Sequence, residues 1–121
     1  MSIKGKGGHA ALPEKTIDPI VIGSSVVSQL QTLVSRTISS KESAVVTIGS
    51  FQAGMTNNVI PDKAILKGTV RTSNEQVRQK IYEAFTQLVT NTVAAHGGEV
   101  EIQYQFLLPA VYNDYLFLYQ V

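Results

Sequence analysis

The chain has 121 residues, of which 44% are hydrophobic and 16% charged, and its formal net charge is +1. These values predict one folded domain with a single core, and they argue against a disordered chain and against a nucleic-acid-binding protein with a basic surface. No cysteine is present, no apolar run approaches the roughly 20 residues of a membrane span, and Met1 is not followed by a signal-peptide pattern, so we expect a cytoplasmic protein with no membrane association.

The first half of the chain predicts a short strand, a helix and a longer strand. Only residues 2–6 could supply the first strand, which therefore looks truncated. Asp18 followed by Pro19 is typical of a helix start, and apolar residues then recur at helical spacing as far as Ile38. Residues 44–52 are rich in β-branched side chains and predict a strand.

The second half predicts a strand, a helix and a strand. Residues 64–72 alternate between apolar and polar side chains after a loop at 53–58. A helix is expected over about 74–96, with Ser73 at the capping position, and Gly97 and Gly98 ending it. Residues 99–106 alternate strictly, as in a strand with one buried face.

This element order predicts an α+β fold. Strand, helix, strand, strand, helix and strand form the split βαβ pattern, so we expect a ferredoxin-like βαββαβ sandwich. Two helices would cover one face of an antiparallel sheet. The other face would carry polar side chains without aromatic rings, which makes RNA recognition by base stacking improbable.

Complete catalytic sites are not found in the sequence. The two histidines, His9 and His96, lie far apart, and no His-x-Asp or Glu-Glu pair accompanies them, so we expect no metal site in this chain. A Gly-x-Ser-x-Gly elbow and a phosphate-binding loop are also missing. His96 fits a histidine at a helix C-terminus.

Three polar residues have unusual settings, and each has a plain structural explanation beside a functional one. His9 lies between Gly-Gly and Ala-Ala, either as a surface histidine or as a donor presented to a ligand. Asn58 lies in a turn-forming stretch, where asparagine tolerates left-handed backbone and caps its neighbours. Arg71 lies on the polar side of a strand, either solvated or placed to bind a carboxylate.

Three sequence blocks in order resemble one family. The first block is Gly-Lys-Gly-Gly-His-Ala-Ala at 5–11. The second block has two parts, Asn-Val-Ile-Pro-Asp at 58–62 and Gly-Thr-Val-Arg-Thr at 68–72. The third block is Ala-His-Gly-Gly at 95–98. This pattern, closing at 109–114, resembles the peptidase dimerisation domain of zinc-dependent aminoacylases, hippurate hydrolases and glutamate carboxypeptidases. The match covers about residues 3–114.

The resemblance implies a lid and dimerisation domain of a metal-dependent amidohydrolase or peptidase that cleaves N-acyl amino acids or small peptides. In that family His9 would be delivered across a homodimer to stabilise the oxyanion, while Asn58 and Arg71 would hold the substrate carboxylate. Two divalent metal ions, expected to be zinc, and the acid/base glutamate would belong to a separate catalytic domain. This chain alone is therefore expected to be inactive.

The division of the chain follows from the same resemblance. Residues 1–114 would be the lid domain of a longer enzyme, and 115–121 form an apolar tail outside the pattern. We expect this tail either to fill the place left by the short first strand or to bind another copy. A stand-alone ferredoxin-like regulatory module that binds a small ligand, or a purely structural dimer, is the alternative.

Overall fold

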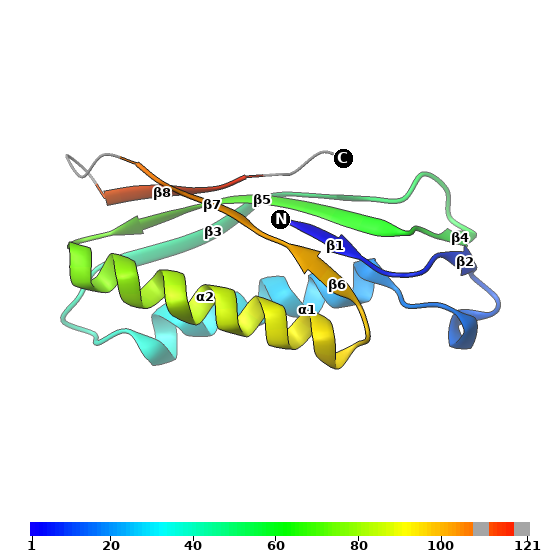
Figure 1. Ribbon diagram of the computed structural model, residues 1–121, viewed down its shortest axis with the longest axis horizontal. Helices are drawn as coiled ribbons and strands as arrows, with labels where there is room; N and C mark the ends of the chain where they lie inside the picture. The colour runs from blue at the N-terminus through cyan, green and yellow to red at the C-terminus, as the bar shows by residue number, and fades with distance from the viewer. Residues whose placement is uncertain (108–111, 118–121) are drawn as a thin grey trace.

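The computed structural model describes residues 1–107 and the backbone of residues 112–117. Two helices pack on one face of an antiparallel sheet, as the sequence predicts (Figure 1). In the described residues, no helix is long and apolar enough to cross a membrane. The elements in chain order are β1 (Ser2–Lys4), β2 (Gly8–His9), the 3-10 turn η1 (Pro13–Lys15), α1 (Pro19–Thr32), the π-helical turn η2 (Leu33–Thr37), β3 (Ala44–Ala53), β4 (Val59–Ile60), β5 (Lys63–Thr72), α2 (Glu75–Ala95), β6 (Glu99–Glu101), β7 (Gln103–Phe106) and β8 (Tyr112–Phe117).

The helix ends follow local chemistry, with one correction. The Asp18 carboxylate accepts a hydrogen bond from the Ile20 amide (2.9 Å) and begins α1, as expected. The expected cap of the second helix, Ser73, is wrong. Asn74 caps α2 by accepting from the Val77 amide (2.9 Å). The Ser73 hydroxyl instead donates to Glu42 (3.3 Å), and α2 begins at Glu75, one residue later than the capping-box spacing suggests.

β5 is the central strand of the sheet. β3 pairs with it along one side and is an edge strand of the sheet that the described residues form, while β1 and β8 lie end to end along the other side. The predicted strand over 99–106 is split at Ile102 into β6 and β7. The split falls where the partner changes from β1 to β8.

β1 is as short as expected, and β8 continues its line. Ser2 pairs with Ile65, and further along β5 Leu116 and Tyr115 pair with Gly68 and Thr69. Residues 112–117 therefore occupy the place beside β5 that a longer first strand would fill, which was one of the two roles expected for the tail. Residues 118–121 lie outside the described residues, and the domain boundary after residue 114 stays a prediction.

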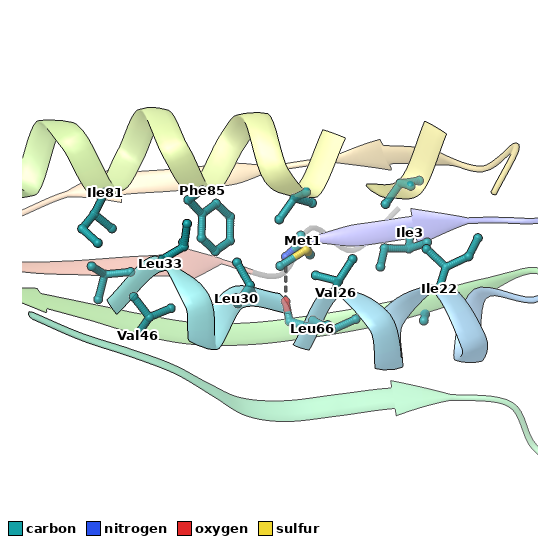
Figure 2. Packing of buried hydrophobic residues seen from close by; sticks show 14 of the residues in the cluster. Met1, Ile3, Ile22, Val26, Leu30, Leu33, Val46, Leu66, Ile81 and Phe85 are labelled. Carbon is teal, nitrogen blue, oxygen red and sulfur yellow. Dashed lines mark hydrogen bonds between the residues drawn. The ribbon is translucent and has the colours of Figure 1, made fainter. Parts of the chain in front are cut away.

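One continuous core joins the helices to the sheet (Figure 2). Phe85 is fully buried at its centre, and burial of each such side chain contributes roughly 1.5–3 kcal/mol. Side chains on the helix-facing side of β1, β3 and β5 pack against α1 and α2, which fixes the opposite side of the sheet as the polar face. The labelled core residues come from six elements and the first residue: Met1, Ile3, Ile22, Val26, Leu30, Leu33, Val46, Leu66, Ile81 and Phe85.

In the isolated 121-residue chain, the α-amino group of Met1 makes stability depend on pH. It donates to the Leu66 carbonyl (2.6 Å) inside the core, and burial, with a contribution from the charge of Lys67, lowers its pKa from 8.0 to about 6 (Figure 2). The unfolded chain binds more protons between these two values. The free energy of unfolding should therefore rise by roughly 1–2 kcal/mol from pH 6 to pH 8, allowing for solvent screening.

Urea titrations at both pH values measure this change. Nα-acetylation of Met1 removes the titrating group, so the acetylated chain provides the matched reference. The difference between the two chains isolates the amine from other ionisable groups. An identical pH dependence with and without the acetyl group would contradict the assignment.

Candidate functional site

A two-stranded ribbon separate from the main sheet holds His9. In this ribbon β2 pairs with β4, with Gly8 opposite Ile60 and His9 opposite Val59. The ribbon lies at the end of the molecule away from β8 (Figure 1). The Ala10 amide donates to the Asn58 carbonyl (3.1 Å), so the fold brings the backbones of His9 and Asn58 together. Both side chains are exposed.

The ring of His9 is oriented by its own turn. The Ala11 amide donates to Nδ1 of His9 (3.0 Å). An N–H donor at Nδ1 requires the lone pair of that nitrogen, so a neutral His9 ring carries its proton on Nε2. The outer nitrogen is thereby available as a hydrogen-bond donor, which is the chemistry that an oxyanion needs.

Asn58 lies at the end of the loop between β3 and β4. Its side-chain oxygen accepts from the Thr56 hydroxyl (3.1 Å), which leaves the NH₂ group as the part that can donate to a ligand. Left-handed backbone is not the reason for an asparagine here. Among the described residues only Gly54 and Gly97 have positive φ, and Gly54 (φ 80°) provides the turn in this loop.

Arg71 lies at the opposite end of the sheet. It is exposed near the end of β5, where it pairs with Val45 of β3 and Asn113 of β8. It lies eight positions along the extended strand from Lys63, which is about 26 Å at 3.3 Å per residue. Within one chain, therefore, the structure does not bring Arg71 to His9 and Asn58.

An apolar hollow that the sequence did not predict lies beside the His9 ribbon. Its volume is about 580 Å³. Met55 is fully exposed and Val59 is 49% exposed there, although both side chains are apolar. The only sequence signal was an apolar Met within a polar loop. The residues that line the hollow are Gln52, Ala53, Gly54, Met55, Thr56, Val59, Pro61, Asp62, Lys63 and Ile65.

The described residues do not fit a metal centre. Across 1–107, together with the strand at 112–117, no group of three or more His, Cys, Asp or Glu side chains could hold an ion. His96 forms the C-cap of α2, where its backbone N–H donates to carbonyl groups of the last helical turn, and it is distant in sequence from the ribbon. The polar side chains of the described residues can bind a charged ligand, but they do not form a set of metal ligands.

Comparison with known proteins identifies the relatives. A family model described as the peptidase dimerisation domain matches residues 1–97. The N-acetylcysteine deacetylase of Bacillus subtilis is 46% identical over 116 residues, which are 96% of this chain and 30% of the relative. An N-acetyldiaminopimelate deacetylase of Anoxybacillus flavithermus is 41% identical over 110 residues, covering 91% of this chain and 29% of the relative.

Solved structures agree with this relationship. A crystal structure of an aminohydrolase from methicillin-resistant Staphylococcus aureus has a TM-score of 0.79 and 33% identity, over 95% of this chain and 27% of that one. The YXEP protein of Bacillus subtilis, described as a dinuclear metal-binding peptidase of the M20 family, has a TM-score of 0.59 and 34% identity, over 83% and 23% of the two chains. The present chain thus spans about 30% of the length of the curated relatives. It belongs to the M20 family of amidohydrolases and peptidases and corresponds to the dimerisation domain of these proteins.

Proposed function

We propose that this chain is the lid and dimerisation domain of an M20 amidohydrolase that removes the acyl group from N-acyl amino acids or cleaves small peptides. The named relatives are deacetylases of N-acetylcysteine and N-acetyldiaminopimelate, which supports this substrate class. The two divalent metal ions, expected to be zinc, would be held by a catalytic domain elsewhere in the longer protein. A cytoplasmic location remains a prediction from the sequence.

One observation carries the proposal: the predicted site residues are split between the two ends of the sheet. His9 and Asn58 lie at one end and Arg71 at the other. A substrate small enough to be an N-acyl amino acid cannot span about 26 Å of strand. If all three residues serve one substrate, a second copy must supply part of the site.

The edge strand β3 offers a simple way to combine the two ends. β3 pairs only with β5 within the described sheet, so its outer side can pair with a second β3. A two-fold axis through this edge runs the two strands antiparallel. The start of β3 lies beside Arg71, and in this arrangement it lies next to the end of β3 in the partner subunit. The chain of the partner subunit continues from there into the ribbon that carries its own copies of His9 and Asn58.

Exposed apolar side chains beside this edge suit burial between two copies. Val45 of β3 is 53% exposed, and Ile20 of α1, whose side chain lies close to Gly54 just after β3, is 39% exposed. Phe51 of β3 is 36% exposed and packs so closely on α1 that a Cβ at Gly23 would lie 2.5 Å from its ring. β3 and α1 therefore form one surface, here called the β3–α1 edge, that a partner would cover.

The division of labour follows from the chemistry of the three side chains. The Nε2–H of His9 would donate to the amide carbonyl oxygen as it gains negative charge. The Asn58 NH₂ group and the planar guanidinium of Arg71 would bind the carboxylate of the amino acid, a task for which a bidentate donor is suited. Each side chain stays exposed in the single chain because its ligand lies outside this domain.

Disruption of the β3–α1 edge tests the dimer. The double variant Ile20→Glu, Val45→Glu places charge where apolar surface should be buried, so we expect it to raise the dimer Kd by about 100-fold or more. Sedimentation velocity across a concentration series measures this, with Thr90→Glu on the exposed side of α2 as the control. A wild-type chain that remains monomeric at high concentration would overturn the proposal.

A further inference from the structure

The ribbon that presents His9 is too small to hold itself. β2 and β4 have two residues each, and such a pair is not stable without other contacts. Backbone hydrogen bonds hold the segment that leads into the ribbon. The Gly5 amide donates to the Asp62 carbonyl (2.8 Å), and Lys6 exchanges hydrogen bonds with Ile17 (2.8 and 2.9 Å).

One side chain completes this anchorage. The Asp62 carboxylate accepts a hydrogen bond from the Gly7 amide (2.8 Å), which joins segments 55 residues apart in the sequence. The approach is so close that a Cβ at Gly7 would clash with the Ile60 carbonyl and lie 2.9 Å from Asp62 Oδ1. Asp62 therefore fixes the backbone two residues before His9.

The same anchorage reaches the imidazole ring. Beyond Gly7 the ribbon pairs through Gly8 and His9, and the turn that follows places the Ala11 amide on Nδ1. Nε2 of His9 has no hydrogen-bond partner among the described residues. A shift of the ribbon would move the Ala11 amide off Nδ1 and release both the tautomer and the ring orientation.

We propose that Asp62 is a positioning residue for His9: its hydrogen bond to Gly7 keeps the Ala11 amide on Nδ1, so that His9 presents Nε2–H outward. The catalytic consequence rests on the proposed function of His9. The positioning itself is a property of this chain and needs neither substrate nor metal. Asp62 acts on His9 through the backbone of Gly7.

Nitrogen NMR of the isolated chain tests the positioning directly. At about pH 8.5, where an ordinary imidazole is neutral, the hydrogen bond should give a resolved coupling between the Ala11 amide nitrogen and His9 Nδ1. The coupling should persist in Asp62→Asn, whose amide oxygen can still accept from Gly7, and disappear in Asp62→Ala. Glu83→Ala, which removes an exposed carboxylate on α2, should keep it.

Asp62→Ser provides a second test if the alanine variant does not fold, because a serine hydroxyl is too short to reach Gly7. A coupling that is missing from the wild type, or that survives in both Asp62→Ala and Asp62→Ser, would overturn the positioning proposal. In the full enzyme Asp62→Ala should lower kcat about tenfold with KM nearly unchanged, and Asp62→Asn should restore kcat. An unchanged kcat in His9→Ala would instead overturn the proposed function alone, leaving the NMR result intact.

Discussion

Replacing His9 by alanine should lower kcat of the enzyme that carries this domain by about 10²–10³-fold. That is the loss of about 3–4 kcal/mol found when one preorganised donor to a developing oxyanion is removed. The donor is preorganised here because the Ala11 amide occupies Nδ1 and the ribbon is anchored through Asp62. The expected change lies in kcat, since the interaction strengthens only as charge develops on the carbonyl oxygen.

Steady-state kinetics on an N-acetyl amino acid measure this effect, and the chain offers a matched control. His96 is also an exposed histidine, but it lies at the end of α2. We therefore expect His96→Ala to keep the wild-type kcat. The isolated chain should show no turnover in the same assay. Equal kcat values for His9→Ala and His96→Ala would contradict the role of His9.

Replacing Arg71 by alanine should lower kcat/KM for substrates with a free carboxylate by about 30–100-fold, mostly through KM. A charge-assisted bidentate bond of this kind contributes roughly 2–3 kcal/mol. Arg71→Lys should recover little of the lost kcat/KM, because an ammonium group lacks the planar pair of donors. The loss should vanish for a substrate whose carboxylate is converted to an amide, since the wild type then has no ionised partner for the guanidinium.

Lys67 is the control for this experiment. It lies on β5 four residues before Arg71, is exposed and carries the same charge. Lys67→Ala changes the net charge as Arg71→Ala does but leaves the guanidinium in place. If both variants raised KM equally, the effect of Arg71 would be long-range attraction and not recognition of the carboxylate.

Much of the fold could be predicted because local signals agreed with the global pattern. Alternation over 64–72 set which side of β5 faces the helices, and Leu66 and Val70 are buried as expected. Gly97, with φ of 79°, ends the second helix where the Gly-Gly pair indicated. The cap at Asn74 could not be predicted, because Ser73 and Asn74 both donate to Glu42, more than 30 positions away in the sequence. The break at Ile102 could not be predicted either, because it depends on where β1 and β8 end.

The candidate site was only partly predictable for a similar reason. The residue types indicated donors for an oxyanion and a carboxylate, and the resemblance supplied their roles. Their grouping depends on the length and direction of β5, which places Arg71 far from Asn58 although only 13 positions separate them in the sequence. The hollow beside Val59 depends on side chains from β3, β4 and β5 meeting in space, which the sequence pattern does not reveal.

The central claim is that each site takes His9 and Asn58 from one lid and Arg71 from the other, and subunit mixing tests it most directly. His9→Ala and Arg71→Ala enzymes would be coexpressed with different tags in equal amounts and assayed at a substrate concentration well below KM, where each variant alone is nearly inactive. Half of the random dimers are mixed, and each mixed dimer has one intact site out of two, so activity should recover to about a quarter of the wild-type value. No recovery in purified mixed dimers would show that both residues serve the same site from one chain, and would contradict the shared-site account.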